Sequence, residues 1–118
     1  MTDTPPNPPR ELRRSGRRLW RQVVGAYELD AHELAMLLEM CRSVDALDEL
    51  AAAVRAEGAV VDGRPHPALV EARQQRITYA RLAAALRLPA GDESDPSALR
   101  RPQRRVGARG VYQLRSVR

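Results

Sequence analysis

Apolar and polar positions alternate with a helical period in three stretches of this chain. In the first stretch the apolar residues recur at steps of three and four, which predicts a helix that begins near Arg10 or Ser15 and ends at Ala26. Its apolar stripe consists of Leu12, Leu19, Trp20, Val23, Val24 and Tyr27. Arginines occupy much of the remaining circumference, so we expect one side of this helix to pack and the other to be strongly basic.

The second stretch predicts a much longer helix. Asp30 is suited to the N-cap, Glu33 can complete a capping box with it, and Gly58 can end the helix after Glu57. If the helix is interrupted, a local break is expected at Ser43 to Asp45. An unbroken helix would be about 40 Å long at 1.5 Å per residue, which is longer than a small core can bury within one chain.

Apolar residues on this long helix form a heptad seam, because they follow one another at spacings of three and four. The seam consists of Leu37, Met40, Val44, Leu47, Ala51 and Val54. Such a seam favours contact with a second copy of the chain. All of its members except Ala51 are therefore predicted to lie in an oligomer interface.

The third stretch follows a turn at Asp62 and Gly63, a pair suited to positive backbone angles. Pro67 sits at the first turn of the predicted helix, and His66 is expected to cap that helix or to pack at the turn. The apolar face consists of Leu69, Ala72, Tyr79, Leu82, Ala83 and Leu86. The predicted fold class is all-α, with a short N-terminal helix packed on a long antiparallel helical hairpin.

The chain has 118 residues, enough for one domain. Residues 1–9 are rich in proline and are predicted to be a disordered arm, and residues 89–118 are predicted to be a flexible, arginine-rich tail. Residues 10–88 remain as the helical core and oligomerisation domain. A core of about 80 residues or fewer often needs a partner subunit to become stable, so we expect self-association.

Charge is unevenly distributed along the sequence. The net charge of +5 divides into +4 for residues 1–22, −3 for residues 23–88 and +4 for residues 89–118. All twenty basic residues are arginine, which fits either a GC-rich genome or a demand for phosphate geometry. Clustered arginines favour contact with a phosphate backbone, because binding releases condensed counterions, although a solvated basic face has the same composition.

Catalytic and metal chemistry find little support in the sequence. Asp45, Asp48 and Glu49 lie within one helical turn, but carboxylates at this spacing more often form a hydrated face or pair with arginines such as Arg42 and Arg55. Two histidines and one cysteine cannot supply the four ligands of a structural zinc site. No phosphate-binding loop of the Walker type is present. We therefore expect no enzymatic activity, cofactor or metal.

Two further residues have alternative interpretations. Trp20 could stack on a base, but its position beside Val23 and Val24 favours a role as the hydrophobic anchor of the first helix. Cys41 falls on the apolar side of the long helix, so a core position is expected rather than a nucleophilic one. A single cysteine, with no signal peptide and no membrane-spanning run, favours a reducing, soluble compartment.

The order and spacing of these features resemble the small terminase subunit of tailed double-stranded DNA phages. The resemblance covers roughly two thirds of the chain and omits both ends. The matching positions are Gly16, Trp20, Tyr27, Leu29, Glu33, Leu37, Leu38, Asp45, Leu50, Gly58, His66, Pro67, Leu69, Glu71 and Leu86 to Pro89.

The resemblance implies a protein of the host cytoplasm that binds double-stranded DNA and regulates the large ATPase and nuclease subunit. It also implies a ring of about eight to ten copies. The predicted DNA-binding residues are Arg10, Arg13, Arg14, Arg17, Arg18, Arg21, Arg100, Arg101, Arg104 and Arg105. The tail arginines could instead contact the large subunit or make no fixed contact.

Two other functions compete with this one. The first is a helical protein-interaction adaptor, in which the basic ends only keep the chain soluble. The second is a sequence-specific DNA regulator, which requires a recognition helix after a tight turn. The turn between Tyr27 and Asp30 is short enough, but the helix that follows it is acidic, which disfavours this function.

Overall fold

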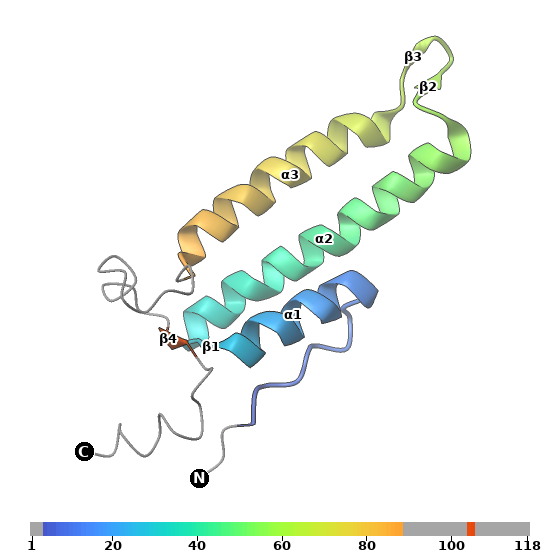
Figure 1. The fold of residues 1–118 in the computed structure, drawn as a ribbon. Helices are drawn as coiled ribbons and strands as arrows, with labels where there is room; N and C mark the ends of the chain where they lie inside the picture. Colours follow the sequence, from blue (N-terminus) through green and yellow to red (C-terminus); the bar gives the residue numbers. More distant parts are fainter. Residues whose placement is uncertain (1–3, 89–103, 106–118) are drawn as a thin grey trace, which may run out of the picture.

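The computed structural model describes residues 4–88 and 104–105, which form three helices and four two-residue strands. The elements are α1 (Arg14–Ala26), β1 (Tyr27–Glu28), α2 (Ala31–Glu57), β2 (Val60–Val61), β3 (Arg64–Pro65), α3 (Pro67–Leu86) and β4 (Arg104–Arg105). The antiparallel helices α2 and α3 form a hairpin, and α1 packs along the first half of α2 on the other side (Figure 1). The predicted helical fold is confirmed, while the short strand pairs were not expected.

Helix α2 runs without interruption through Ser43 to Asp45, so the local break does not occur. Its N-terminus carries the predicted capping box, in which the Asp30 backbone N–H donates to Glu33 Oε1 at 2.7 Å. Gly58 follows its last residue with φ 91°, a backbone angle that glycine adopts without steric cost. Both ends of the longest helix are thus set by local sequence.

The connection from α2 to α3 is a small β-hairpin. Val60 pairs with Pro65 and Val61 with Arg64 in antiparallel register. The two turn residues, Asp62 and Gly63, have φ of 54° and 74°, as their sequence predicted. The hairpin forms the far end of the molecule from β1 (Figure 1).

His66 joins the end of α2 to the start of α3. Its Nδ1 accepts a hydrogen bond from the Ala68 backbone N–H at 2.9 Å, so the side chain is the N-cap of α3. Its Nε2 contacts the Glu57 carboxylate, and only 7% of the residue is exposed. Because Nδ1 is an acceptor, the proton of the neutral ring lies on Nε2, where it is donated to Glu57. The capping role predicted for His66 is confirmed.

The main core lies between α1 and the first half of α2. The buried residues of this cluster are Leu12, Trp20, Val23, Val24, Leu37 and Cys41. Trp20 is 5% exposed, which decides its role in favour of the hydrophobic anchor. On the other side of the hairpin, α3 buries Ala68, Ala72 and Leu86. The protein therefore has a core on one half and a thinner helix pair on the other.

Two of the predicted interface residues differ from the expectation. Leu37 is fully buried and Met40 is 4% exposed, so other parts of the same chain already cover both side chains. Neither offers surface to a second copy in this conformation. Val44, Leu47 and Val54 are half-buried, and their place in an oligomer interface stays a prediction.

Part of the N-terminal arm also differs from the expectation of disorder. Residues 4–9 run as an extended segment beside α1, and the Trp20 Nε1–H donates to the Pro6 carbonyl at 2.9 Å. The Leu12 N–H donates to the Pro9 carbonyl at 3.2 Å, which closes a turn before α1. A proline-rich segment can be ordered in this way because its carbonyl oxygens remain free to accept hydrogen bonds.

The described part of the C-terminal tail is β4. It pairs with β1 in antiparallel register, with Tyr27 opposite Arg105 and Glu28 opposite Arg104. These two tail residues therefore lie against the connection between α1 and α2. The predicted flexibility of residues 89–103 and 106–118 lies outside the described residues. No helix in the described part of the chain is long and apolar enough to cross a membrane.

Candidate nucleic-acid interface

Helix α1 presents an arginine face to solvent. Arg14, Arg17, Arg18 and Arg21 fall within an arc of about 100° at 100° per residue. The opposite side of the helix is buried and consists of Gly16, Trp20, Val23 and Val24. No acidic residue occurs in α1, so the helix carries a net charge of +4. The predicted division into one packed side and one basic side is confirmed.

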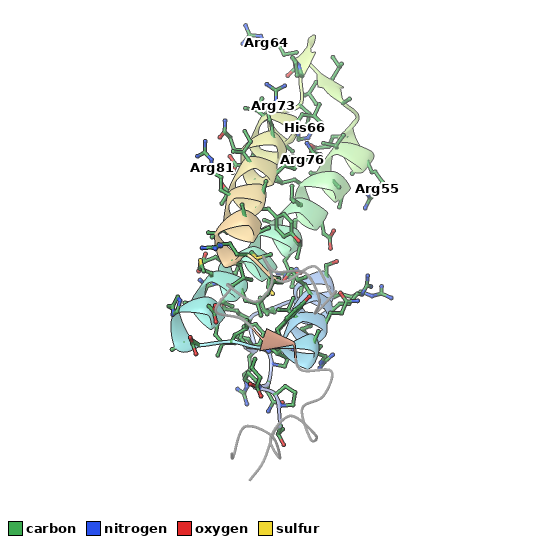
Figure 2. All side chains as sticks on the ribbon, turned by 60° about the vertical axis from the view of Figure 1, so that its left-hand side comes forward. Arg55, Arg64, His66, Arg73, Arg76 and Arg81 are labelled. Atoms are coloured by element: carbon green, nitrogen blue, oxygen red, sulfur yellow. The ribbon has the colours of Figure 1, made fainter. Side chains whose placement is uncertain are left out.

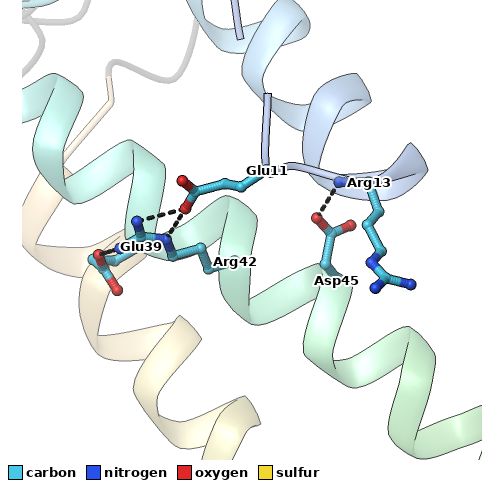
Figure 3. A network of polar contacts seen from close by, with 5 residues as sticks. All are labelled: Glu11, Arg13, Glu39, Arg42 and Asp45. Carbon is cyan, nitrogen blue, oxygen red and sulfur yellow. Dashed lines mark hydrogen bonds and ion pairs between the residues drawn. The ribbon is translucent and has the colours of Figure 1, made fainter. Parts of the chain in front are cut away.

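The start of α1 is held by a carboxylate from α2. Asp45 Oδ2 accepts the Arg13 backbone N–H and Asp45 Oδ1 accepts the Gly16 N–H, each at 2.7 Å (Figure 3). Arg13 is the N-cap residue by position, but its own side chain makes no capping hydrogen bond. Asp45 therefore satisfies two amides that would otherwise lack partners at the helix start, and it fixes α1 against α2.

Gly16 makes this close approach possible. A Cβ atom at this position would lie 2.9 Å from the Cys41 carbonyl oxygen and closer still to the Asp45 carboxylate. Real side chains essentially never tolerate such distances, so the space between α1 and α2 at this point admits only glycine. The sequence resemblance included both Gly16 and Asp45, and the structure brings them together across 29 residues.

Further polar contacts hold the segment before α1. Arg42 pairs with Glu11 at 2.5 Å and with Glu39, and Arg13 pairs with Glu49 at 3.2 Å (Figure 3). The hydrogen bond to Glu11 is the main cause that raises the pKa of the Arg42 guanidinium. Exposed pairs of this kind contribute little stability individually, but together they restrict where the chain enters α1.

The three neighbouring acids of α2 all engage α1 or the residue before it. Asp45 accepts backbone amides, Asp48 accepts the Ser15 hydroxyl, and Glu49 pairs with Arg13. One of the two predicted alternatives was pairing with arginines, and Glu49 does pair with an arginine, but with Arg13. Arg42 binds Glu11 and Glu39 instead. Among the described residues, no group of three or more His, Cys, Asp or Glu could hold a metal ion.

Not every arginine predicted to bind DNA is equally available. Arg13 is occupied by Glu49, and Arg17 donates to the Arg10 carbonyl at 2.9 Å. Arg14, Arg18 and Arg21 are exposed on the arginine face, and Arg10 is exposed just before it. The backbone of Arg104 and Arg105 lies at the opposite end of α1, beside β1. Arg100 and Arg101 lie outside the described residues.

The sequence did not indicate the arginines of the α2–α3 helical hairpin as DNA-binding residues. Arg64 lies at the tip, Arg73, Arg76 and Arg81 are exposed on α3, and Arg55 projects from α2 (Figure 2). Arg81 extends on the side of α3 that faces away from α2 (Figure 2). The third helix has a net charge of +2, which the charge sum over residues 23–88 concealed because α2 has a net charge of −4.

An open groove of about 320 Å³ lies over α2, between α1 and α3. We call it the α1–α3 groove. It is lined by Ser15, Arg18, Leu19, Gln22, Val44, Leu47, Asp48 and Tyr79. Arg18 belongs both to this groove and to the arginine face, so the two surfaces share an edge.

Cys41 does not contribute a reactive group to either surface. It is fully buried, and burial, together with the nearby Asp45 charge, raises the pKa of its thiol to about 12. A thiol with this pKa is protonated at neutral pH and is a poor nucleophile. The predicted core position of Cys41 is confirmed.

No protein-family model, curated protein sequence or solved structure matches this chain. Its function must therefore be inferred from the arginine face, the groove and the contacts that position them.

Proposed function

We propose that this chain is a small terminase subunit of a tailed double-stranded DNA phage. In this function it binds the viral genome through the arginine face of α1 and presents it to the large ATPase and nuclease subunit. It would do so in the host cytoplasm as a ring of about eight to ten copies. The observation that supports the proposal most is the set of four arginines on one solvent-facing side of a rigidly anchored helix.

Phosphate binding needs arginines that are exposed, close together and held on a fixed surface. The anchoring of α1 meets the last condition, because Trp20 is buried on one side and Asp45 holds the helix start. The helix has 13 residues and is therefore about 20 Å long, so its face spans several phosphates of a duplex. No base recognition is required for this contact, which suits a protein that gathers DNA without a fixed sequence.

The adaptor function is the second candidate, and the α1–α3 groove favours it. A groove with apolar residues on its floor and walls can receive a helix from another protein. Under this alternative the arginine face is only solubilising. Duplex DNA would then not be retained at physiological salt, and removing arginines from α1 would change nothing but net charge.

The experiment that separates the two candidates measures duplex DNA affinity against salt concentration. For B-DNA, log Kobs falls by about 0.9 per phosphate contact for each unit of log salt. We expect the triple variant Arg14→Ala, Arg18→Ala, Arg21→Ala to flatten this slope by about 2.7 per bound copy. Circular dichroism would confirm that the variant remains helical.

The matched control removes the same charge from the helical hairpin and the turn that connects its helices. Arg55, Arg64 and Arg76 are also exposed, and their triple alanine variant should leave the slope close to that of the unmodified chain. An equal loss in both variants would mean that only net charge matters and would contradict a specific α1 contact. A slope near zero in the unmodified chain would overturn the proposed DNA binding altogether.

A further inference from the structure

The second half of α2 is covered less completely than the first half. All of its buried residues lie between Glu33 and Ser43, and none lies between Val44 and Glu57. The contacts that α1 and Arg13 make with α2 extend to Asp48 and Glu49, and the part of α2 beyond them lies beside α3 (Figure 1). Two helices packed alone leave apolar surface in water, so this half of the hairpin has the character of an incomplete core.

The α1–α3 groove lies at the start of this half, where α1 still flanks α2. Val44 and Leu47 contribute to it from α2 and are half-buried, while Leu19 and Tyr79 line it from the two flanking helices. Asp48 adds an acidic group, on a helix whose net charge is −4. Arg18 lines the opposite wall, so the groove is suited to a helix that is apolar along one stripe and directs its basic groups toward α2 and away from α1.

The outer face of α3 has these properties. Val70 is 58% exposed and Ile77 is 41% exposed, and their spacing of seven positions brings both to the same side of the helix. Arg73 and Arg81 lie on this side as well, four residues before and after Ile77. We call this surface the outer stripe of α3. It faces away from the side that buries Ala72 against α2.

We infer that the outer stripe of α3 in one copy docks in the α1–α3 groove of the next copy. This inference rests on the proposed ring-forming subunit and names the two surfaces through which it assembles. Apolar contact between Ile77 and Leu47 covers the half-buried seam, and Arg73 and Arg81 approach an acidic helix. Because the two surfaces are different, each copy uses one as donor and the other as acceptor, which is a heterologous contact that can close into a ring.

The contact also connects assembly to DNA binding through α1. One wall of the groove is formed by α1, whose outer side is the arginine face, and Arg18 belongs to both surfaces. Docking of a neighbour therefore places the arginine faces of successive copies in a fixed relation to one another. Several copies then offer phosphate contacts together, as a ring that gathers DNA requires.

The test uses two single variants of the full chain, each of which disables one surface. Ile77→Glu places a carboxylate on the outer stripe, and it lies four residues from both Arg73 and Arg81, so the helix is retained while docking against acidic α2 is opposed. Leu47→Arg blocks the groove, and its long stem can lie along the groove floor with the charge in solvent. Native mass spectrometry and light scattering would report the particle mass.

We expect the unmodified chain to form multimers and each variant alone to be monomeric. An equimolar mixture of the two variants should form dimers with one copy of each, because the intact stripe of one fits the intact groove of the other. Val60→Glu serves as the control, since Val60 is 65% exposed at the hairpin tip, outside both surfaces, and this variant should assemble normally. A mixture that stays monomeric, or a variant that assembles like the unmodified chain, would overturn the inference.

A second measurement does not depend on disrupting the contact. A chain with both Leu47→Cys and Ile77→Cys should form a ladder of disulfide-linked multimers on mild oxidation, whereas a chain with only one of these cysteines should not. The buried Cys41 thiol does not compete, because its pKa is about 12. Absence of the ladder from the double variant would overturn the inference even if Ile77→Glu or Leu47→Arg failed to fold.

Failure of this inference and failure of the proposed DNA binding give different results. A monomeric chain whose DNA affinity falls steeply with salt would overturn the docking contact and leave the phosphate contact standing. A chain that assembles through the stripe and the groove but does not bind duplex DNA would overturn the phosphate contact and leave the docking contact standing.

Discussion

At the start of α1, a carboxylate from a different helix takes the place of a local N-cap. Asp45 can reach the Arg13 and Gly16 amides because Gly16 has no side chain to keep the two helices apart. The cap is therefore also the packing contact between α1 and α2. A change at either residue is expected to affect both the stability of α1 and the orientation of its arginine face.

Gly16→Ala should destabilise the protein, although alanine is usually the better helix former. We expect a loss of roughly 2 kcal/mol in the free energy of unfolding, because the added methyl group overlaps the Cys41 carbonyl and the Asp45 carboxylate. Gly25→Ala is the matched control in the same helix. No atom lies within 4 Å of its position for a Cβ, so this variant should be stabilised by up to about 1 kcal/mol. Urea unfolding would measure the stability of both variants. Equal losses in the free energy of unfolding would contradict this account of Gly16.

At the scale of the elements, the two long helices are joined by a histidine that belongs to both. His66 caps α3 through Nδ1 and contacts Glu57 at the end of α2 through Nε2. A side chain with only one polar atom could not make both interactions at once. The hairpin is therefore closed by a single buried imidazole.

His66→Ala should weaken the hairpin more than His66→Asn does. Alanine loses the cap of α3 and leaves the Ala68 amide without a side-chain acceptor, which costs about 1 kcal/mol, whereas asparagine is among the best N-cap residues. Asparagine is too short to restore the contact with Glu57, so its stability should fall between those of alanine and histidine. Equal stabilities for the two variants, measured by urea unfolding, would show that the cap is not the main contribution of His66.

At the scale of the whole molecule, an acidic helix lies between two basic ones. Helix α2 has a net charge of −4, and α1 and α3, which pack on its two sides, carry +4 and +2. This arrangement keeps opposite charges adjacent within the protein and leaves arginines on both outer helices. It accounts for a chain whose middle is acidic in sequence while its two outer helices are basic.

The N-terminal segment also belongs to the packed molecule, because it contacts Trp20, the hydrophobic anchor of α1. Deletion of residues 1–9 should remove the Pro6 carbonyl that accepts the Trp20 indole N–H. We expect a loss of about 1 kcal/mol in stability and a shift of the tryptophan emission to longer wavelength, because water would reach the ring. Deletion of residues 1–3 alone is the control and should leave the spectrum unchanged. An unchanged spectrum after the longer deletion would mean that other residues shield Trp20 from water.

The sequence by itself determined the three helices and most of their ends. The capping box at Asp30, the glycine at 58, the turn at Asp62 and Gly63, and the His66 cap were all predictable, because each depends on residues close together in the chain. Helical periodicity also predicted the basic side of α1. These features are local, and local physical chemistry was enough to find them.

Only the tertiary structure decided which helix covers which surface. Leu37 and Met40 belong to the same seam as Val44 and Leu47, yet the first pair is buried within the chain and the second lines a groove. Periodicity places residues on a face but does not say how far a neighbouring helix extends along it. The Asp45 cap and the pairing of β4 with β1 likewise join residues that are distant in sequence, so they exist only once the helices have packed.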